Sequence, residues 1–362
     1  MRILHIAQSL LGGGVQNFLV SLLPEQVKMG HEVGLVVIDR YTRDYCHKLE
    51  HVFTDNGVKV FLLNKKVGNK TSFIKTVIKA IRITRHFKPD IVNSHTNLPD
   101  LYGSLVTAFT KAKLVITIHN GPEIWGLANK ILNRNTPLIF CSQSAFELRT
   151  QKNKNIIAID NGISEKIVKT DKVIDLRKEL GLDADAKIIV SVGSLRPQKN
   201  YELLMSIVDE LKQTNIHFCI CGGNYGVGYI DVNKFSKYNC NIHFLGLRSD
   251  VSAIENGADL FLSCSTFEGL PIAVLEAFFN GIPCVLSPIP QHEKIAKGVY
   301  ATYIPQSFNG IGFVETILFA LKQTENHGLI YQKRKACIEK FSISETAMKY
   351  IAFYEKQLQL DR

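Results

Sequence analysis

The sequence predicts an α/β protein built from two parallel-sheet domains, and three observations support this fold class. The chain has 362 residues, enough for two domains of ordinary size with a hydrophobic core each. Short, almost continuously apolar segments alternate with helical ones, which is the pattern of strands buried on both faces. Glycine-rich or polar residues follow several of these segments, at the sheet edge where open α/β sheets bind ligands.

The expected strands fall into two groups, separated by a polar stretch without a strong apolar stripe at residues 163–186. The first group is 2–8, 31–38, 58–62, 90–95, 113–118, 138–141 and 156–159. The second group is 187–192, 216–221, 242–245, 259–263 and 283–286. Helices are expected between them, among them 16–29, which Pro24 should bend or interrupt, and the chain after residue 309 reads mostly as helix. We therefore expect domains at 1–162 and 187–342, with 163–186 as hinge.

Composition limits the class of protein. Hydrophobic residues make up 46% and charged ones 21%, typical of a soluble globular protein. No run of 18 apolar residues suggests a membrane span, and residues 1–11 read as a first strand rather than a signal peptide. The eight cysteines lack metal spacing, so we expect reduced, buried thiols in the cytoplasm. The net charge of +10 favours an anionic partner, of which nucleic acid is the weakest candidate because no nucleic-acid-binding motif is present.

Residues 72–87 predict an amphipathic helix with a basic face. Its expected buried stripe is Ile74, Val77, Ile78 and Ile81, and its opposite side carries Lys75, Lys79, Arg82 and His86. Such a face is usually only solvated. It would also suit an anionic membrane surface, so both interpretations stay open.

The most informative stretch is 263–277, where a buried strand leads into a helix. Pro271 is expected at the first helical position, which places Glu268 in the preceding loop and Glu276 in the second helical turn. Two carboxylates beside a helix N-terminus would suit a ligand with hydroxyls and a phosphate, such as a nucleotide sugar. The alternative is that Glu268 caps the helix and Glu276 is solvated, and spacing alone does not exclude it.

This stretch resembles the Glu-x7-Glu region of glycosyltransferase family 4. The resemblance rests on Glu268-Gly269-Leu270-Pro271, on Glu276-Ala277 and on the sequence GIPCV at 281–285. It implies a retaining enzyme of the GT-B fold, with two Rossmann-like parallel-sheet domains facing each other across a cleft. It also implies that a C-terminal helix at 343–358 returns to pack on the first domain.

A second segment, 193–200, resembles the family's Gly-x-Leu-x-x-x-Lys-Gly loop, with Asn200 in place of the last glycine. The resemblance implies that Arg196 and Lys199 hold the donor diphosphate. It implies donor-binding roles for Gly13, Gly14, Gly193, Arg196, Lys199, Gly222, Leu247, Glu268, Gly269, Leu270, Pro271 and Glu276. The segment Thr117-Ile118-His119 resembles the family's Thr-x-His, which implies that His119 contacts the transferred sugar; the catalytic set is then Glu268, His119, Arg196 and Lys199. His95, also at a strand end facing the expected cleft, is a weaker candidate.

The implied function is transfer of a sugar from a UDP- or GDP-sugar to an acceptor hydroxyl, on a lipid-linked or polysaccharide intermediate of cell-surface glycan synthesis. No cofactor or metal is expected, and Asp183-Ala184-Asp185 reads as a solvated turn. We expect a cytoplasmic protein, either free in solution or peripheral on the inner face of the membrane. The alternatives are a sugar-nucleotide 2-epimerase of GT-B fold and a catalytically inactive nucleotide-sugar-binding partner.

Overall fold

The computed structural model divides the chain into two compact units. The first unit is Met1–Ser164 with Phe341–Arg362, and the second is Glu165–Lys340. The residues that the structure describes are 1–10, 14–40, 44–66, 70–119, 125–150, 155–223, 230–238, 241–323 and 325–360.

The first unit is built on a parallel sheet that has seven strands within the described residues. They are β1 (Arg2–Ala7), β2 (Glu32–Asp39), β3 (Lys59–Lys65), β4 (Ile91–His95), β5 (Lys113–Ile118), β6 (Leu138–Phe140) and β7 (Ile156–Ala158). Their order is β3-β2-β1-β4-β5-β6-β7. The chain reverses its direction of growth between β1 and β4, so this unit has a topological switch point at the carboxyl ends of those two strands.

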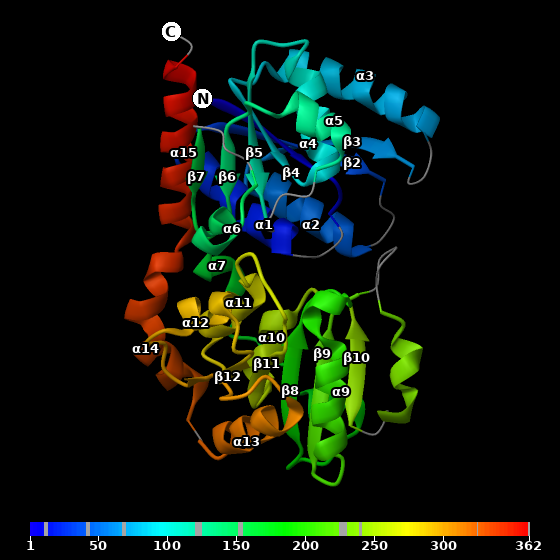
Figure 1. The fold of residues 1–362 in the computed structure, drawn as a ribbon, viewed down its shortest axis with the longest axis vertical. Helices are drawn as coiled ribbons and strands as arrows, with labels where there is room; N and C mark the ends of the chain where they lie inside the picture. Colours follow the sequence, from blue (N-terminus) through cyan, green and yellow to red (C-terminus); the bar gives the residue numbers. More distant parts are fainter. Residues whose placement is uncertain are drawn as a thin grey trace. The chain divides into compact units, whose positions relative to one another are not determined.

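Helices cover both faces of this sheet (Figure 1). One face packs against α1 (Gly14–Lys28), α2 (Asp44–Asp55) and α15 (Ile343–Gln359). The other packs against α3 (Lys70–Phe87), α4 (Asn97–Thr107), α5 (Leu127–Leu132) and α6 (Gln143–Glu147). The C-terminal α15 lies along α1, where the Tyr350 and Phe18 rings are 5.9 Å apart. The expectation that Pro24 interrupts α1 is wrong: Pro24 is buried inside one continuous helix.

The predicted buried stripe of α3 is wrong at two positions. Ile74 and Ile78 are 64% and 46% exposed, although both were expected to face the core. Thr76, Ala80 and Phe87 are buried instead, and the Thr76 hydroxyl is 2.6 Å from the Tyr102 hydroxyl. A hydrogen-bonded threonine can occupy a core position, so the real buried face is rotated from the one that apolar periodicity indicates.

The second unit contains a parallel sheet with six strands among the described residues. They are β8 (Lys187–Val192), β9 (Ile216–Cys221), β10 (Ile242–Gly246), β11 (Leu260–Ser263), β12 (Cys284–Leu286) and β13 (Thr302–Tyr303), in the order β10-β9-β8-β11-β12-β13. Its switch point lies between β8 and β11. The two-residue β13 is the only one of these thirteen described strands that sequence reading missed, because two residues carry no periodicity.

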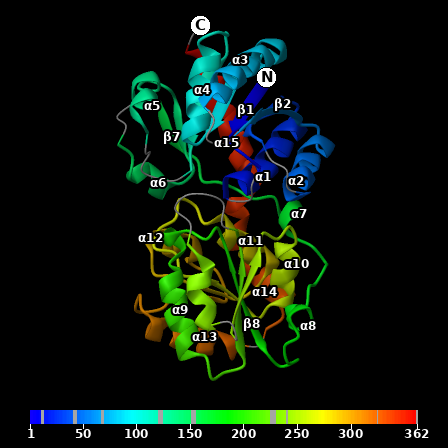
Figure 2. The ribbon, with the colours of Figure 1, turned by 90° about the vertical axis from the view of Figure 1, so that its right-hand side faces the viewer.

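Helices also cover both faces of the second sheet (Figure 2). On one face lie α9 (Tyr201–Glu210) and α13 (Gly310–Leu321). On the other lie α10 (Val251–Gly257), α11 (Ile272–Asn280) and α14 (His327–Ile338). The shorter elements are α7 (Glu165–Val168), α8 (Leu176–Leu180), α12 (Pro290–Ala296), and the 3-10 helices η1 (Pro197–Lys199), η2 (Val232–Tyr238) and η3 (Glu339–Phe341). Residues expected as hinge thus include α7 and α8, which belong to the second unit.

Candidate functional site

Two loops meet at the switch point of the second sheet. The loop after β8 runs from Gly193 into η1, and the loop after β11 runs from Cys264 to α11. The Thr266 backbone N–H donates to the Gln198 carbonyl at 2.9 Å, and the Gln198 side-chain amide donates to the Phe267 carbonyl at 2.7 Å. These bonds join segments about 70 residues apart in sequence, and they fix both loops at the sheet edge where α/β proteins bind ligands.

An ion pair between Lys199 and Glu268 is the centre of this site. Lys199 Nζ lies 2.7 Å from Glu268 Oε1, and the Ser265 hydroxyl donates to the same oxygen at 2.6 Å. Burial alone would raise the pKa of Glu268, but the Lys199 ammonium and these hydrogen bonds outweigh it and lower that pKa below its usual value. Glu268 is therefore an ionised carboxylate in a largely dry setting.

Glu268 does not cap the helix that follows it. The N-cap position of α11 is Pro271, one residue before the helix, and its side chain makes no capping hydrogen bond. The capping alternative raised by the sequence is thus wrong, because the Glu268 oxygens accept from Lys199, Ser265 and Gln198 instead.

Sequence reading missed His292, a buried histidine close to this pair. Its Nδ1 lies 3.0 Å from the Ser287 hydroxyl, and burial lowers its pKa to about 4 although the Glu268 charge acts in the opposite direction. His292 is therefore neutral at pH 7 and adds no cation beside Lys199. No motif in the sequence singles it out, since it follows β12 at the start of a short helix.

Two glycines permit the loops to pack this closely. A Cβ on Gly222 would lie 1.8 Å from the Gly193 carbonyl oxygen, and a Cβ on Gly193 would lie 2.7 Å from Cε of Lys199. Only glycine fits at Gly222 without moving backbone. The two glycines therefore hold β8, β9 and the Lys199 side chain together.

The other predicted donor residues of this unit lie on the loops at the same sheet edge or close to it. Arg196 is exposed at the residue before η1, and Glu276 is half-buried in the second turn of α11. Leu247, also half-buried, follows Gly246 at the end of β10. Next to it, Arg248 forms ion pairs with Glu179 and Asp250. Gly269 and Pro271 are buried and Leu270 is half-buried.

In the first unit, His119 follows β5 and is partly exposed. Its Nε2 lies 2.9 Å from Nδ1 of His95, which is itself completely buried. The expectation that His95 faces the cleft is therefore wrong, because its two ring nitrogens contact other histidines. Gly14 is the exposed first residue of α1. Gly13, which the resemblance also implicated, lies outside the described residues.

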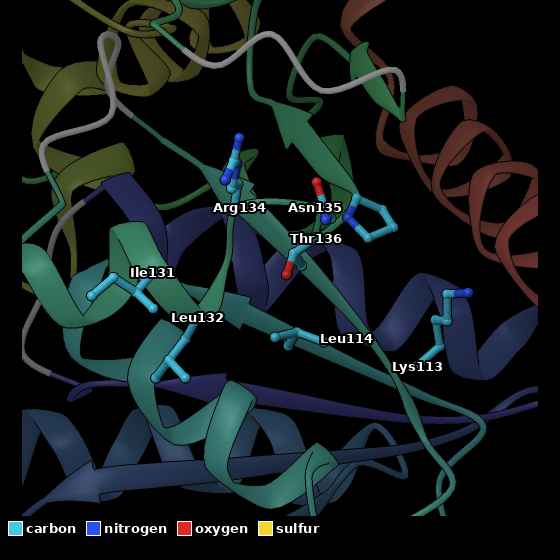
Figure 3. A pocket seen from close by; sticks show the side chains of 8 residues that line it. Lys113, Leu114, Ile131, Leu132, Arg134, Asn135 and Thr136 are labelled. Carbon is cyan, nitrogen blue, oxygen red and sulfur yellow. The ribbon is translucent and has the colours of Figure 1, made fainter.

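Figure 3 shows a surface pocket of the first unit that is lined by none of these residues. Its volume is about 320 Å³. Lys113, Leu114, Thr136 and Pro137 line it at the amino ends of β5 and β6. Ligands of parallel sheets bind at the carboxyl ends, so this pocket is not part of the candidate site.

The residues that the structure describes contain neither a metal-binding cluster nor a membrane-spanning helix. No group of three or more histidine, cysteine, aspartate or glutamate side chains there is arranged to hold a metal ion. No described helix has both the length and the apolar character to cross a bilayer.

Comparison with known proteins defines the class. Residues 172–340 match the family model "Glycosyl transferases group 1", and residues 12–167 match "Glycosyltransferase Family 4". The structure of Anabaena HepE in complex with UDP-glucose superposes with a TM-score of 0.79 at 16% identity, covering 99% of both chains. A glycosyltransferase structure from Rickettsia africae gives a TM-score of 0.74 at 15% identity, covering 98% of both.

Two curated proteins from Escherichia coli are also similar to this chain in sequence. The UDP-Gal:alpha-D-GlcNAc-diphosphoundecaprenol alpha-1,3-galactosyltransferase is 24% identical over 318 residues, which is 80% of each chain. The O-antigen biosynthesis glycosyltransferase WclY is 25% identical over 334 residues, 85% of this chain and 90% of its own. The fold is that of GT-B glycosyltransferases. The chain belongs to glycosyltransferase family 4, a family of retaining enzymes that use nucleotide-sugar donors.

Proposed function

We propose that the second unit binds the nucleotide-sugar donor at the Lys199–Glu268 pair. The observation that carries this proposal is the meeting of these two side chains at 2.7 Å, at the switch point of the sheet. A lysine ammonium has three donors, so Lys199 can bind Glu268 and a phosphate oxygen together. Glu268, ionised and buried, can accept hydrogen bonds from sugar hydroxyls.

The remaining roles follow from chemistry and position. Arg196, exposed at the residue before η1, joins Lys199 on the diphosphate, whose charge grows as the anomeric carbon–oxygen bond breaks. Glu276 accepts from the two ribose hydroxyls, and Leu247 lies beside the base. His119 of the first unit contacts the transferred sugar. The backbone at 193, 222 and 269–271 approaches the donor closely, and the resemblance gives a donor-binding role to Gly13 and Gly14 as well.

The reaction is transfer with retention at the anomeric carbon. The acceptor oxygen forms its bond to that carbon on the face from which the diphosphate leaves, and the departing diphosphate takes the hydroxyl proton. This route needs no nucleophilic side chain. The acceptor is a lipid-linked or polysaccharide intermediate of cell-surface glycan synthesis, supported by the relatives that act on a diphosphoundecaprenol-linked sugar and in O-antigen synthesis.

Lys199→Ala tests the donor site. Removing a fixed cation from the leaving diphosphate should lower turnover by roughly two to three orders of magnitude. Lys212→Ala is the matched control, because Lys212 is an exposed lysine of the same unit, ion-paired only to Asp209 among the described residues. The measurement is release of nucleoside diphosphate from a panel of UDP-, GDP- and ADP-sugars. If the two variants release nucleoside diphosphate at equal rates, Lys199 does not hold the donor diphosphate. That result would favour the alternative of an inactive partner protein. Release of nucleoside diphosphate only when a lipid-linked acceptor is added would argue against the 2-epimerase alternative, which needs no acceptor.

We also propose that α3 and α5 dock on the cytoplasmic face of an anionic membrane, where a lipid-linked acceptor lies. Ile74 and Ile78 on α3, and Leu127, Ile131 and Leu132 on α5, are the exposed apolar residues of this surface. Both helices pack on α4. Lys75, Arg82 and Lys130 lie among them, and the sequence of α3 contains no acidic residue. Exposed isoleucines beside cations match a lipid interface better than a purely basic, solvated face would.

Vesicle binding tests this surface. Wild-type protein should sediment with vesicles of phosphatidylglycerol and phosphatidylcholine, and much less with phosphatidylcholine alone. Ile74→Glu with Ile78→Glu should lower partitioning by roughly tenfold or more, since two apolar contacts are lost. Ile311→Glu, an equally exposed isoleucine on α13 of the second unit, is the control. If both variants partition like wild type, α3 does not dock.

A further inference from the structure

Three histidines form one hydrogen-bonded chain beneath the candidate sugar contact of the first unit. His5 Nδ1 lies 3.0 Å from His95 Nε2, and His95 Nδ1 lies 2.9 Å from His119 Nε2. The rings of neighbouring histidines are 5.3 and 5.2 Å apart between centroids. His5 is on β1 and His95 ends β4, so the chain crosses the switch point of the first sheet.

All three rings are neutral in the folded protein. Burial lowers the pKa of His5 to about 4 and that of His119 to about 3, and it holds the pKa of His95 well below the usual value. A neutral imidazole carries one N–H and one lone pair. Each bond in the chain therefore fixes which nitrogen of the next ring carries the hydrogen, and the three tautomers can change only together.

Gln26 on α1 closes the far end of the chain. Its Oε1 lies 2.9 Å from His5 Nε2, and a carbonyl oxygen can only accept. His5 must then carry its hydrogen on Nε2. The orientation of the Gln26 amide therefore decides the tautomer of every ring up to His119.

Gln26 is completely buried and its Nε2 makes no hydrogen bond to any described residue, so the groups around it decide how the amide is oriented. The Asn93 amide donates to the Val115 backbone carbonyl at 3.0 Å, which leaves Asn93 Oδ1 to accept from the Tyr354 hydroxyl at 2.9 Å. Tyr354 has then used its hydrogen on Asn93, so toward the neighbouring Gln26 amide it can act only as an acceptor, which favours the orientation with Nε2 on the Tyr354 side.

We propose that this network locks His5, His95 and His119 in the Nε2–H tautomer, so that His119 presents the lone pair of Nδ1 to its ligand. None of the described residues bonds to that atom. A lone pair accepts only from a donor, which makes the group recognised at His119 a sugar hydroxyl and not a carboxylate. His5, His95 and Gln26 are positioning residues, and the identity of the ligand rests on the proposed function.

Nitrogen-15 NMR of the ligand-free protein with labelled histidine tests the lock directly. We expect Nδ1 of His5, His95 and His119 to give the signal of an unprotonated nitrogen and Nε2 that of N–H, each assigned by the loss of its signals in a His→Gln variant. Nδ1–H on His119 would overturn the proposal. This measurement needs no substrate, so its failure leaves glycosyl transfer at Lys199 untouched, and failure of transfer leaves the lock standing.

Two variants test whether Gln26 sets the tautomer of His119 through the hydrogen-bonded row of histidines. Gln26→Met removes the acceptor at nearly constant size and should give mixed tautomers at His119, two rings away. Ser21→Ala, a buried polar position of the same helix, should leave His119 unchanged. An unchanged His119 tautomer in Gln26→Met would overturn the role of Gln26. Adding UDP-glucose or GDP-mannose to wild type should shift His119 Nδ1, and no shift with either would overturn the assignment of His119 to ligand recognition.

Discussion

At the scale of the residue, the candidate donor site depends on how charge is balanced around Glu268. A buried carboxylate is costly unless it is paired, and Glu268 is paired with Lys199 and accepts from Ser265. The nearby His292 stays neutral because it is buried. The Lys199–Glu268 pair is therefore neutral as a whole without a ligand, and Arg196 supplies a further positive charge for a diphosphate.

Glu268→Gln should lower the free energy of unfolding by about 1–2 kcal/mol at pH 7, because it leaves the Lys199 ammonium without its counter-ion. The loss of stability is modest because the Lys199 side chain keeps some contact with water. Glu210→Gln, at an exposed position of α9, should leave stability unchanged. Urea unfolding of both variants makes the comparison, and equal midpoints would contradict a stabilising role for the pair.

At the scale of the element, close packing of the loops after β8 and β9 depends on Gly222. Gly222→Ala should cost about 3 kcal/mol or more, since its Cβ would overlap the Gly193 carbonyl oxygen and backbone cannot move away cheaply. Gly298→Ala is the control: its φ of +76° is strained for alanine, but the space around it is open, so about 1–2 kcal/mol is expected. Denaturation midpoints that rank the variants the other way would contradict this account.

Most of the strands and helices could be predicted from the sequence, because parallel strands are short, apolar and separated by helices. It failed where tertiary contacts override local pattern. Thr76 is buried on α3 by its bond to Tyr102, and no periodicity of apolar residues could show this. The loops that carry Lys199 and Glu268 were predicted from motifs, but Gln198 and Ser265, which hold them together, were not. The chain from Gln26 to His119 joins residues 21 to 90 positions apart, and only the fold brings them together.

At the scale of the whole molecule, both units place polar side chains at the switch point of a parallel sheet. The second unit places an ion pair there, and the first places three neutral histidines. The two arrangements respond to acid in different ways. An ion pair is lost when its carboxylate is protonated, whereas buried neutral histidines lose stability as soon as the unfolded chain can bind protons.

The first unit should therefore lose stability as the pH falls from 6.5 toward 4. His5, His95 and His119 have a pKa near 6.5 when unfolded and a lower one when folded, so the unfolded state binds up to three more protons in this range. Asp100 acts in the opposite direction, because burial raises its pKa to about 7 and the folded state keeps its proton. For these four groups, three protons minus one leaves two, which corresponds to a loss of about 3 kcal/mol per pH unit near pH 5; His31 of the same unit, whose pKa is also lowered by burial, acts in the same direction.

The fluorescence of Trp125 reports the pH dependence of unfolding for the first unit alone. It is the chain's single tryptophan, it belongs to the first unit, and its indole N–H donates to Asp100. The urea midpoint from tryptophan fluorescence should fall steeply between pH 6.5 and 4.5. His95→Gln should reduce the slope by about one proton, and His51→Gln, at an exposed histidine, should not change it. A midpoint independent of pH would mean that the three rings are not held neutral, and it would remove the physical basis for a fixed tautomer at His119.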